Sequence, residues 1–240
     1  MHTLSDITAV ILAGGAGTRL RETLPGIPKV LADIGGRPFI MILLERLAYF
    51  DVRRVILCTG YLGDLIENAL GNTFGPIGLT YSRELRPLDT AGAIANARHL
   101  LPPGPLLIMN GDSYCHTDLN RFYDWFQSGT ASVGLLLTRA TDTARYGRVE
   151  IDSSGQIIAF REKSHQNGPG LINAGIYIID KAVIETVPES VPCSLEKEIF
   201  PGLADGRLAG FPTRDAFIDI GTGEDYNKAA AFFATLDGQI

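Results

Sequence analysis

A glycine-rich segment near the amino terminus carries residue types that bind phosphate. It reads LAGGAGTRL over residues 12–20 and follows directly on an apolar run. Glycines let backbone N–H groups approach phosphate oxygens closely, and Thr18 and Arg19 add a hydroxyl and a fork of guanidinium donors. The dinucleotide-binding fingerprint needs a glycine at Leu20, and a P-loop needs Gly-Lys-Ser/Thr, so both are excluded. A glycine-rich turn without a ligand is the alternative that the segment alone leaves open.

A lysine follows ten residues after Arg19. Lys29 comes directly after Pro28, at the mouth of the cleft that the glycine-rich segment would form. A lysine in isolation is usually an exposed surface residue. Downstream of a phosphate-binding segment, however, it supplies a second local cation for a polyphosphate ligand.

Two aspartates stand at positions suited to a metal ion. Asp112 closely follows the apolar run 106–109, and ligands of parallel sheets bind beyond the carboxyl ends of the strands. Asp219 is flanked on both sides by isoleucine, where a buried charge is costly unless it is paired or binds a metal. Mg²⁺ takes one or two protein carboxylates and completes its shell with phosphate oxygens and water. A turn or cap role for Asp112 and a solvent-facing Asp219 stay open as alternatives.

The elements that must position these residues alternate between strands and helices. Apolar runs with β-branched residues predict buried strands, and apolar residues at helical spacing predict helices. Pro38 suits a first helical turn, Thr90 an N-cap and Gly71 a C-cap. This alternation predicts a parallel sheet covered on both faces. The expected strands are 8–12, 54–58, 79–82, 106–109 and 132–138, and the expected helices are 38–50, 62–70, 90–100 and 118–128.

The second half of the chain is richer in strands. Turn residues at 152–155 predict a hairpin of 147–151 with 156–160. A strand within 170–180, two short strands within 208–217 and a helix at 223–236 complete the expected elements. The sequence shows no repeat, low-complexity tract or flexible linker. We therefore expect residues 1–240 to form a single domain with two halves, of about residues 1–140 and about residues 141–240.

Composition and charge limit the kinds of partner and the cellular location that we expect for the protein. With 45% hydrophobic and 20% charged residues among 240, the chain has ample material for a core. A formal net charge of −6 argues against a general nucleic-acid binder. No apolar run approaches the roughly 18 residues of a membrane helix, and the amino terminus lacks the features of a signal peptide. Three widely spaced cysteines predict reduced thiols in a cytoplasmic protein, and Cys115-His116 alone is too small a set for zinc.

The glycine-rich segment and Pro28-Lys29 resemble the signature of the sugar-1-phosphate nucleotidylyltransferase family. The resemblance continues along nearly the whole chain as short motifs in common order: LDTAGA at 88–93, NGD at 110–112, YG at 146–147, FREK at 160–163, NAGIY at 173–177 and DIGT at 219–222. It implies an α/β protein with a Rossmann-like three-layer mixed sheet, the nucleotide-diphospho-sugar transferase fold, and a β-rich sugar-binding part. It also implies transfer of a nucleoside monophosphate from an NTP to a sugar 1-phosphate, with release of pyrophosphate.

The resemblance carries roles onto individual residues. Catalysis is expected from Arg19, Lys29, Asp112 and Lys163, with one Mg²⁺ shared by Asp112 and Asp219. The first half is expected to bind the nucleotide through Leu12, Ala13, Gly14, Gly15, Gly17, Thr18, Arg19, Lys29, Glu84, Thr90, Ala91, Gly92, Asn110 and Gly111. The second half is expected to bind the sugar phosphate through Tyr146, Gly147, Glu162, Lys163, Asn173, Ala174 and Gly175, the glycines giving room for the ring.

The sequence departs from the family pattern at two places. Ser164 replaces the customary proline after Lys163, and Asp89 stands where glycine is more usual. Without the resemblance, Glu162-Lys163 would be interpreted as a solvated surface pair. The chemistry needs no general base, because the attacking sugar-phosphate oxygen is already anionic, so none of the four histidines requires a catalytic role.

Within the family, the chain looks most like compact guanylyltransferases that act on D-glycero-D-manno-heptose 1-phosphate. This rests on LPGIPK at 24–29, GRPF at 36–39 and Arg21-Glu22 in place of a proline common in thymidylyl- and uridylyltransferases. GTP is therefore the expected nucleotide, with Glu84 accepting from guanine, in the synthesis of surface-polysaccharide precursors.

Several alternatives stay open. They are a mannose-1-phosphate guanylyltransferase, a thymidylyl- or uridylyltransferase for a hexose 1-phosphate, a transferase for a non-sugar acceptor, and a nucleotide-sugar-sensing regulatory protein that is not an enzyme. The oligomeric state is also open, a homodimer included.

Overall fold

The first half of the chain forms a parallel sheet from four of the predicted strands. The computed structural model describes residues 4–15, 17, 20, 23–161, 168–203 and 206–236. Strands β1 (Thr8–Leu12), β4 (Arg54–Thr59), β6 (Ile77–Arg83) and β7 (Pro105–Asn110) run parallel in the order β7-β1-β4-β6. Their carboxyl ends therefore lie at one edge of the sheet, where open α/β sheets bind ligands.

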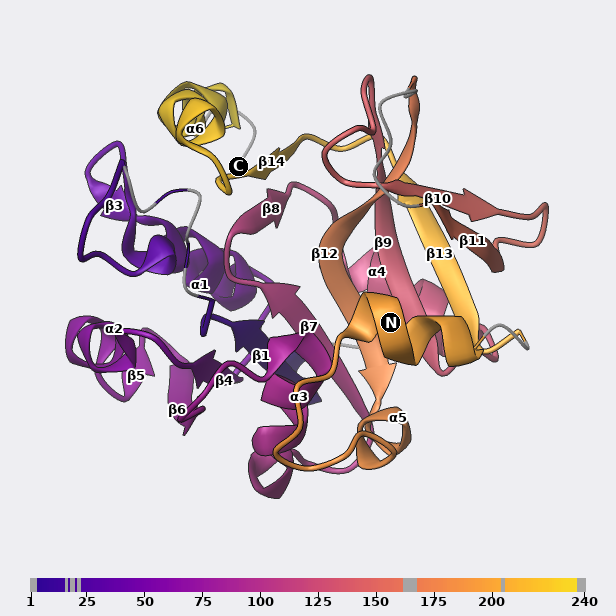
Figure 1. The fold of residues 1–240 in the computed structure, drawn as a ribbon, viewed down its shortest axis with the longest axis horizontal. Coiled ribbons are helices and arrows are strands. Elements are labelled where there is room, and N and C mark those ends of the chain that lie inside the picture. Colours follow the sequence, from indigo (N-terminus) through magenta and orange to yellow (C-terminus); the bar gives the residue numbers. More distant parts are fainter. Residues whose placement is uncertain are drawn as a thin grey trace.

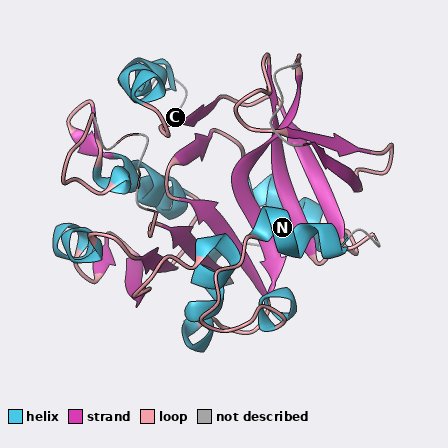
Figure 2. Ribbon diagram, viewed as in Figure 1, coloured by secondary structure: helices cyan, strands magenta, loops and turns pink. Residues whose placement is uncertain are grey.

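Side chains of these strands point alternately to two apolar layers. On β1, Ala9 and Ile11 belong to one core cluster and Val10 to the other. Helices α1 (Phe39–Tyr49), α2 (Gly63–Leu70), α4 (Leu119–Ser128) and α6 (Gly223–Leu236) cover the first cluster, and α3 (Asp89–Asn96) and α5 (Lys181–Glu185) cover the second. The predicted three-layer arrangement is confirmed, and Figure 2 shows the strands between helices.

Strand β12 joins the two halves of the chain into one mixed sheet. β12 (Gly170–Asp180) runs antiparallel to β7, with Ile176 opposite Met109, and pairs on its other side with β9 (Val133–Ala140) and β10 (Arg148–Ile151). β11 (Ile157–Arg161) forms the predicted hairpin with β10, and β13 (Leu208–Thr213) pairs parallel with β9. Figure 1 shows β12 between β7 and β9. The expected mixed sheet is therefore correct.

Of the two short strands expected within 208–217, β13 lies inside this range and β14 (Phe217–Asp219) begins at its last residue. The pairing of β14 and several other short elements were not predicted. β8 (Ser113–Cys115) pairs with β14, β2 (Asp33–Ile34) pairs with β3 (Arg37–Pro38), and β5 (Thr73–Phe74) pairs with β6. A π-helical turn spans Leu195–Ile199. Two- to five-residue elements are too short to display a hydrophobic period, so only the tertiary structure reveals them.

Some predicted helix ends need correction. Helix α1 begins at Phe39, so Pro38 precedes the helix instead of forming its first turn. Helix α3 ends at Asn96, and a separate 3-10 turn covers Arg98–Leu100. Gly71 ends α2 with φ of +64°, a left-handed φ that suits glycine, and this prediction is confirmed.

The three cysteines are buried, free thiols. Burial raises the pKa of Cys58 to about 12, and the nearby charge of Glu84 adds to the effect. Burial likewise raises the pKa of Cys115 to about 12. Thiols with such pKa values are unreactive at neutral pH, because the thiolate is the nucleophile. Across the described ranges, none of the helices combines the length and apolarity needed to cross a bilayer.

Candidate active site

A small pocket forms where the glycine-rich segment meets the end of strand β7. Its volume is about 180 Å³. Leu12 lies opposite Asn110 in the β1–β7 register, and Gly111 N donates to Leu12 O at 3.0 Å. The segments that follow the two strands therefore leave the sheet side by side. The lining residues are Leu12, Ala13, Gly15, Gly17, Lys29, Val30, Gly111, Asp112 and Gly221.

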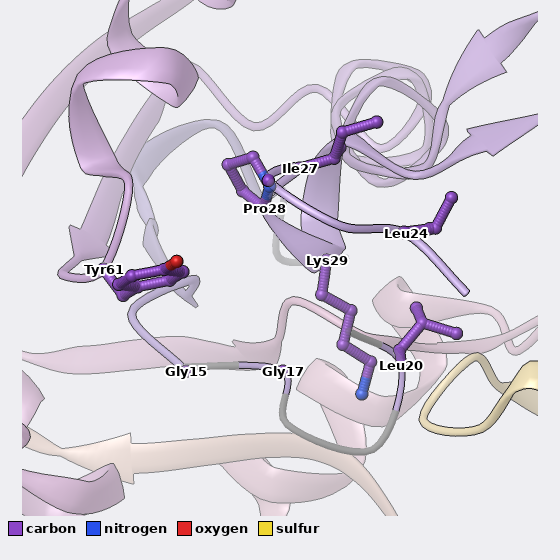
Figure 3. A pocket seen from close by; sticks show the side chains of 9 residues that line it. Gly15, Gly17, Leu20, Leu24, Ile27, Pro28, Lys29 and Tyr61 are labelled. Carbon is purple, nitrogen blue, oxygen red and sulfur yellow. The ribbon is translucent and has the colours of Figure 1, made fainter. Parts of the chain in front are cut away.

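The predicted lysine and the first predicted metal ligand are in direct contact. Lys29 Nζ donates to Asp112 Oδ2 at 2.5 Å, and the two side chains are 13% and 36% exposed. Lys29 opens a 3-10 turn, Lys29–Leu31, directly after Pro28. Figure 3 shows its side chain extending toward the glycine-rich segment, with the ring of Tyr61 on the side of Gly15. A cation and a carboxylate therefore meet in the small pocket.

The β8–β14 pair brings the second predicted metal ligand beside Gly221, which lines this pocket. Asp219 lies opposite Ser113, one residue after Asp112, and Ile220 N donates to Asp112 O at 2.9 Å. The alternative of a solvent-facing Asp219 is wrong, because this side chain is only partly exposed and its Oδ1 accepts from Gly221 N at 2.5 Å. The two aspartates therefore sit at neighbouring strand ends although they are 107 positions apart in the sequence.

Burial and the charge of Asp112 raise the pKa of Asp219. Lys29, the N–H of Gly221 and Arg145 act in the opposite direction but do not cancel the effect. A partly buried carboxylate whose ionised form is disfavoured by a second carboxylate favours a bound cation, because the cation offsets the repulsion. In the described part of the chain, no three His, Cys, Asp or Glu side chains come together as a metal site.

We expect Asp219→Asn to stabilise the metal-free protein at neutral pH. The folded state holds the Asp219 proton more tightly than the unfolded chain, whose pKa is about 3.9. The wild-type free energy of unfolding therefore falls as pH rises through the raised pKa, and asparagine removes that loss. Thermal unfolding with a chelator at pH 7.5 should give a higher Tm for the variant, by roughly 2–4 °C for each kcal/mol gained at this chain length.

The pH dependence makes this expectation specific. The Tm difference between the variant and wild type should shrink toward pH 4, where Asp219 is increasingly protonated in both states. Added Mg²⁺ should raise the Tm of the wild-type protein more than that of Asp219→Asn. A variant that is less stable than wild type at pH 7.5 in chelator would contradict the raised pKa.

A large pocket continues from the small one toward helix α3. Its volume is about 710 Å³, and the two pockets share Leu12, Gly15 and Asp112. The large pocket extends along the end of β6 to Glu84 and Thr90. Of the predicted nucleotide-binding residues, it is lined by Leu12, Gly14, Gly15, Glu84, Thr90 and Asn110.

Glu84 places its carboxylate between two glycines of the large pocket. A Cβ atom at Gly14 would lie 2.9 Å from Glu84 Oε1, and one at Gly60 would lie 2.8 Å from the same atom. Glu84 Oε2 accepts from Leu88 N at 3.2 Å, whereas Oε1 accepts no hydrogen bond from the residues that the structure describes. Burial raises the pKa of Glu84, with Asp89 adding to the shift and the Leu88 N–H opposing it. The half-buried carboxylate therefore has acceptor capacity to offer a ligand.

Two residues that follow Glu84, Thr90 and Asp89, bear on expectations from the sequence. Thr90 makes no N-cap of helix α3; its Oγ1 donates to Glu196 Oε2 at 3.2 Å and accepts from Leu195 N at 2.8 Å. The residue where glycine is more usual, Asp89, has φ of +57°. This left-handed conformation suits glycine, and aspartate is among the few other residues that adopt it readily.

Two predicted residues on α3 are explained by packing. Ala91 is fully buried. Gly92 N donates to Cys193 O at 3.0 Å, and a Cβ atom at Gly92 would lie 2.7 Å from Val191 O. A glycine at this position therefore lets the helix approach the 191–193 segment closely.

A polar network that the sequence did not reveal connects the large pocket with strand β12. Tyr177, buried in the core, donates from its hydroxyl to Glu196 Oε1 at 2.8 Å, and Asn173 Nδ2 donates to the same hydroxyl at 2.8 Å. Burial and the charge of Glu196 raise the pKa of Tyr177 well above its ordinary range. Sequence reasoning missed Glu196, which lies in a charged run typical of a solvated surface. The signal was Tyr177, a tyrosine within an apolar strand whose hydroxyl needs a partner.

Those predicted sugar-binding residues that the structure describes lie on β12 and before β10. Asn173 Oδ1 accepts from Gly175 N at 2.9 Å. Gly175 has φ of +73°, and a Cβ atom there would lie 2.5 Å from Ser113 Oγ and 2.7 Å from Asn110 Nδ2. The space beside Gly175 is therefore filled by protein, so this glycine permits close packing instead of leaving room for a sugar ring. Gly147 also has a left-handed φ, of +77°.

Four predicted site residues lie outside the described residues. They are Thr18 and Arg19 in the glycine-rich segment, and Glu162 and Lys163 after strand β11.

Comparison with known proteins decides the family. The model of the family described as "Nucleotidyl transferase" matches residues 8–235. The chain belongs to the nucleotidyl transferase family. It is 36% identical over 231 residues to mannose-1-phosphate guanylyltransferase of Mycobacterium tuberculosis, covering 94% of this chain but 64% of that protein, less than two-thirds of its length. It is also 36% identical over 222 residues to D-glycero-alpha-D-manno-heptose 1-phosphate guanylyltransferase of Aneurinibacillus thermoaerophilus, covering 92% of this chain and 96% of that protein.

Solved structures agree with this family membership. The crystal structure of HddC from Yersinia pseudotuberculosis has a TM-score of 0.84 and 37% identity, covering 95% of this chain and 99% of that one. The same protein complexed with GMP-PN also has a TM-score of 0.84, at 36% identity. The nucleotidyl transferase fold therefore extends over nearly the whole chain.

Proposed function

We propose that this nucleotidyl transferase moves GMP from GTP to D-glycero-D-manno-heptose 1-phosphate, giving a GDP-sugar and pyrophosphate. The observation that carries the proposal is the convergence of the glycine-rich segment, Lys29 and Asp112 on two adjoining pockets, with Asp219 next to Gly221 at the edge of the small one. The names of the Aneurinibacillus relative and of the GMP-PN complex of HddC support guanine and a heptose. Mannose 1-phosphate is the second candidate acceptor, because the Mycobacterium relative is named for it.

The two pockets would hold different parts of the nucleotide. The triphosphate would occupy the small pocket, where Lys29 and the amides of the glycine-rich segment offer positive charge and donors. The base would enter the large pocket, where Glu84 Oε1 can accept from the N1–H and 2-amino groups of guanine. Arg19 would hold the phosphates together with Lys29. Residues 1–140 would thus form most of the nucleotide half.

Mg²⁺ fits the two aspartates. Asp112 and Asp219 supply hard carboxylate oxygens at neighbouring strand ends, and their like charges favour a cation between them. We propose that these two residues hold the ion. When bound, it would neutralise phosphate oxygens and the charge that develops on pyrophosphate.

The protein's contribution to the reaction is positioning and charge neutralisation. A phosphate oxygen of the sugar 1-phosphate attacks the α-phosphorus of GTP, and the bond from that phosphorus to the β-phosphate oxygen breaks. Lys29 would stabilise the pyrophosphate that leaves, and Lys163 would hold the incoming sugar phosphate. Holding both polyanions in line can supply up to roughly 7–11 kcal/mol.

The sugar would bind beside the β-rich half. Tyr146, Gly147 and the 173–175 segment would surround it, with the Glu162 carboxylate accepting from sugar hydroxyls. Glu196, held by Tyr177 and Thr90, connects this region with the base pocket. The same hydrogen-bond network would therefore adjoin the binding sites of both substrates.

A substrate panel tests the proposal. Pyrophosphate release should be measured with GTP, ATP, UTP, CTP and dTTP against heptose, mannose and glucose 1-phosphates. The expected result is the highest kcat/KM for GTP with the manno-configured heptose phosphate. A preference for dTTP or UTP with glucose 1-phosphate would overturn the assignment. Nucleotide-sugar binding without turnover would instead favour a regulatory protein.

A further inference from the structure

An ion pair near the proposed sugar site links two segments far apart in the sequence. Arg145 lies in the 141–147 segment between β9 and β10, and its Nη1 is 2.5 Å from Oδ2 of Asp225 at the start of helix α6. The Arg145 side chain is 41% exposed and the Asp225 side chain 16% exposed. Because Asp225 is largely shielded from water, removal of Arg145 would leave a mostly buried carboxylate without its cation. We call this pair the Arg145–Asp225 clasp.

The Asp225 side of the clasp is tied to the metal-ligand motif. Thr222 Oγ1 donates to Asp225 Oδ2 at 2.6 Å, and Asp225 N donates to Thr222 Oγ1 at 3.3 Å. Thr222 follows Asp219 by three residues. The first turn of α6 and the turn after β14 are therefore held as one unit.

The Arg145 side of the clasp is tied to the proposed sugar-binding turn. The Arg145 guanidinium lies over the ring of Tyr146, 5.3 Å from its centroid. The Tyr146 ring contacts the ring of Phe217 edge-on, with centroids 5.8 Å apart and an interplanar angle of 75°. Phe217 is the first residue of β14, the strand that ends at Asp219. The turn before β10 is thus joined to the β14–α6 unit twice, by an aromatic contact to β14 and by the clasp to α6.

We propose that Arg145 is a positioning residue for the sugar 1-phosphate. The clasp holds the 146–147 turn against β14, so that a sugar bound beside Tyr146 presents its phosphate next to Asp219. Arg145 acts through Tyr146 and the Asp219 segment and is not itself a catalytic residue. This inference rests on the proposed function.

Because Arg145 lies outside the nucleotide pockets, we expect its removal to affect the two substrates differently. The nucleotide pockets are lined by residues from the glycine-rich segment, the 29–30, 60–62, 83–93 and 110–112 segments, and Gly221. Arg145 belongs to none of these segments. Loss of the clasp should therefore weaken use of the sugar 1-phosphate much more than use of GTP.

Steady-state kinetics of Arg145→Ala tests the inference. The KM for the sugar 1-phosphate should rise roughly 10-fold or more, because even a small displacement of a reactant weakens its productive binding strongly. The KM for GTP should stay within about twofold. Arg145→Lys should recover part of the loss. Asp225→Arg combined with Arg145→Asp should be more active than either single variant. Arg139→Ala, which changes an exposed arginine at the end of β9, is the matched control and should resemble wild type.

The outcomes separate the clasp from a purely structural role. Thermal unfolding of each variant shows whether the fold is kept. Equal increases in both KM values, an unchanged KM for the sugar phosphate, or charge-reversed pairs no better than the single variants would each overturn the inference. If the wild-type protein is active and Arg145→Ala behaves like it, only the clasp role fails. If the wild-type protein turns over no pair of NTP and sugar 1-phosphate, the proposed function fails and the clasp role fails with it.

Discussion

Asp112→Asn should lower kcat by at least about 10³-fold while the protein keeps its fold. Asp112 is the carboxylate that Lys29 contacts at 2.5 Å, and its backbone O accepts from N of Ile220, the residue after Asp219. Asparagine keeps the shape of the side chain but removes the charge that would hold Mg²⁺ against the phosphates. Pyrophosphate release under saturating GTP and sugar phosphate gives kcat, and circular dichroism with thermal unfolding reports on the fold.

A surface aspartate provides the control for this experiment. Asp51 pairs with Arg53 before the start of β4, at the end of the strand away from the pockets, and its side chain is 52% exposed. Its φ of +64° is one that asparagine also tolerates, so Asp51→Asn should keep the wild-type kcat. The metal assignment would be wrong if Asp112→Asn retained a kcat within tenfold of wild type. A loss of fold in Asp112→Asn would instead show that the Lys29–Asp112 pair is needed for stability.

Glu84→Ala should abolish the preference for guanine. The Glu84 carboxylate reaches the large pocket between Gly14 and Gly60, and its Oε1 is placed to accept from a ligand. A hydrogen bond to a charged group is worth about 1.5–3 kcal/mol, so the wild-type enzyme should favour GTP over ITP, which lacks the 2-amino group, by roughly 10- to 100-fold. Glu84→Ala should bring this ratio of kcat/KM values close to one and lower the kcat/KM for GTP by roughly 10²-fold or more.

The control and the pH dependence sharpen this test. Glu45→Gln changes an exposed carboxylate that pairs with Arg37 outside the pockets and should leave the GTP-to-ITP ratio unchanged. Because burial raises the pKa of Glu84, KM for GTP should increase as pH falls through that pKa and the carboxylate becomes protonated. An undiminished GTP-to-ITP ratio in Glu84→Ala would place the base contact elsewhere.

Most residues of the small pocket, though not Val30 and Gly221, could be chosen from sequence because their signals are local. The glycine-rich segment follows an apolar strand, Asp112 follows another, and neighbouring parallel strands bring their ends to the same edge of a sheet. Hydrophobic residues repeating with a period of about two residues in strands and about 3.6 in helices also identified the long elements. Resemblance supplied the order of the later motifs, including Asp219.

The contacts that complete the site depended on the tertiary structure. The pairing of β8 with β14 joins three-residue segments that are too short to show a period, yet it places Asp219 beside Asp112. Glu196 has the sequence context of a surface charge, and only the approach of Tyr177 and Thr90 gives it partners. Thr90 at the start of a helix suggested a cap, but these same long-range hydrogen bonds take its hydroxyl instead.

The sequence by itself therefore determined the alternation of elements, the glycine-rich segment after β1 and the charged residues that we propose for phosphate binding and catalysis. Each of these follows from side-chain type and spacing within about a dozen residues. Only the tertiary structure decided which charges lie near each other: Lys29 pairs with Asp112, Arg145 pairs with Asp225, and the charge of Asp112 acts on Asp219. The physical reason is that the energy of a charge depends on its burial and on partners that the fold brings from distant parts of the chain, and local spacing encodes neither.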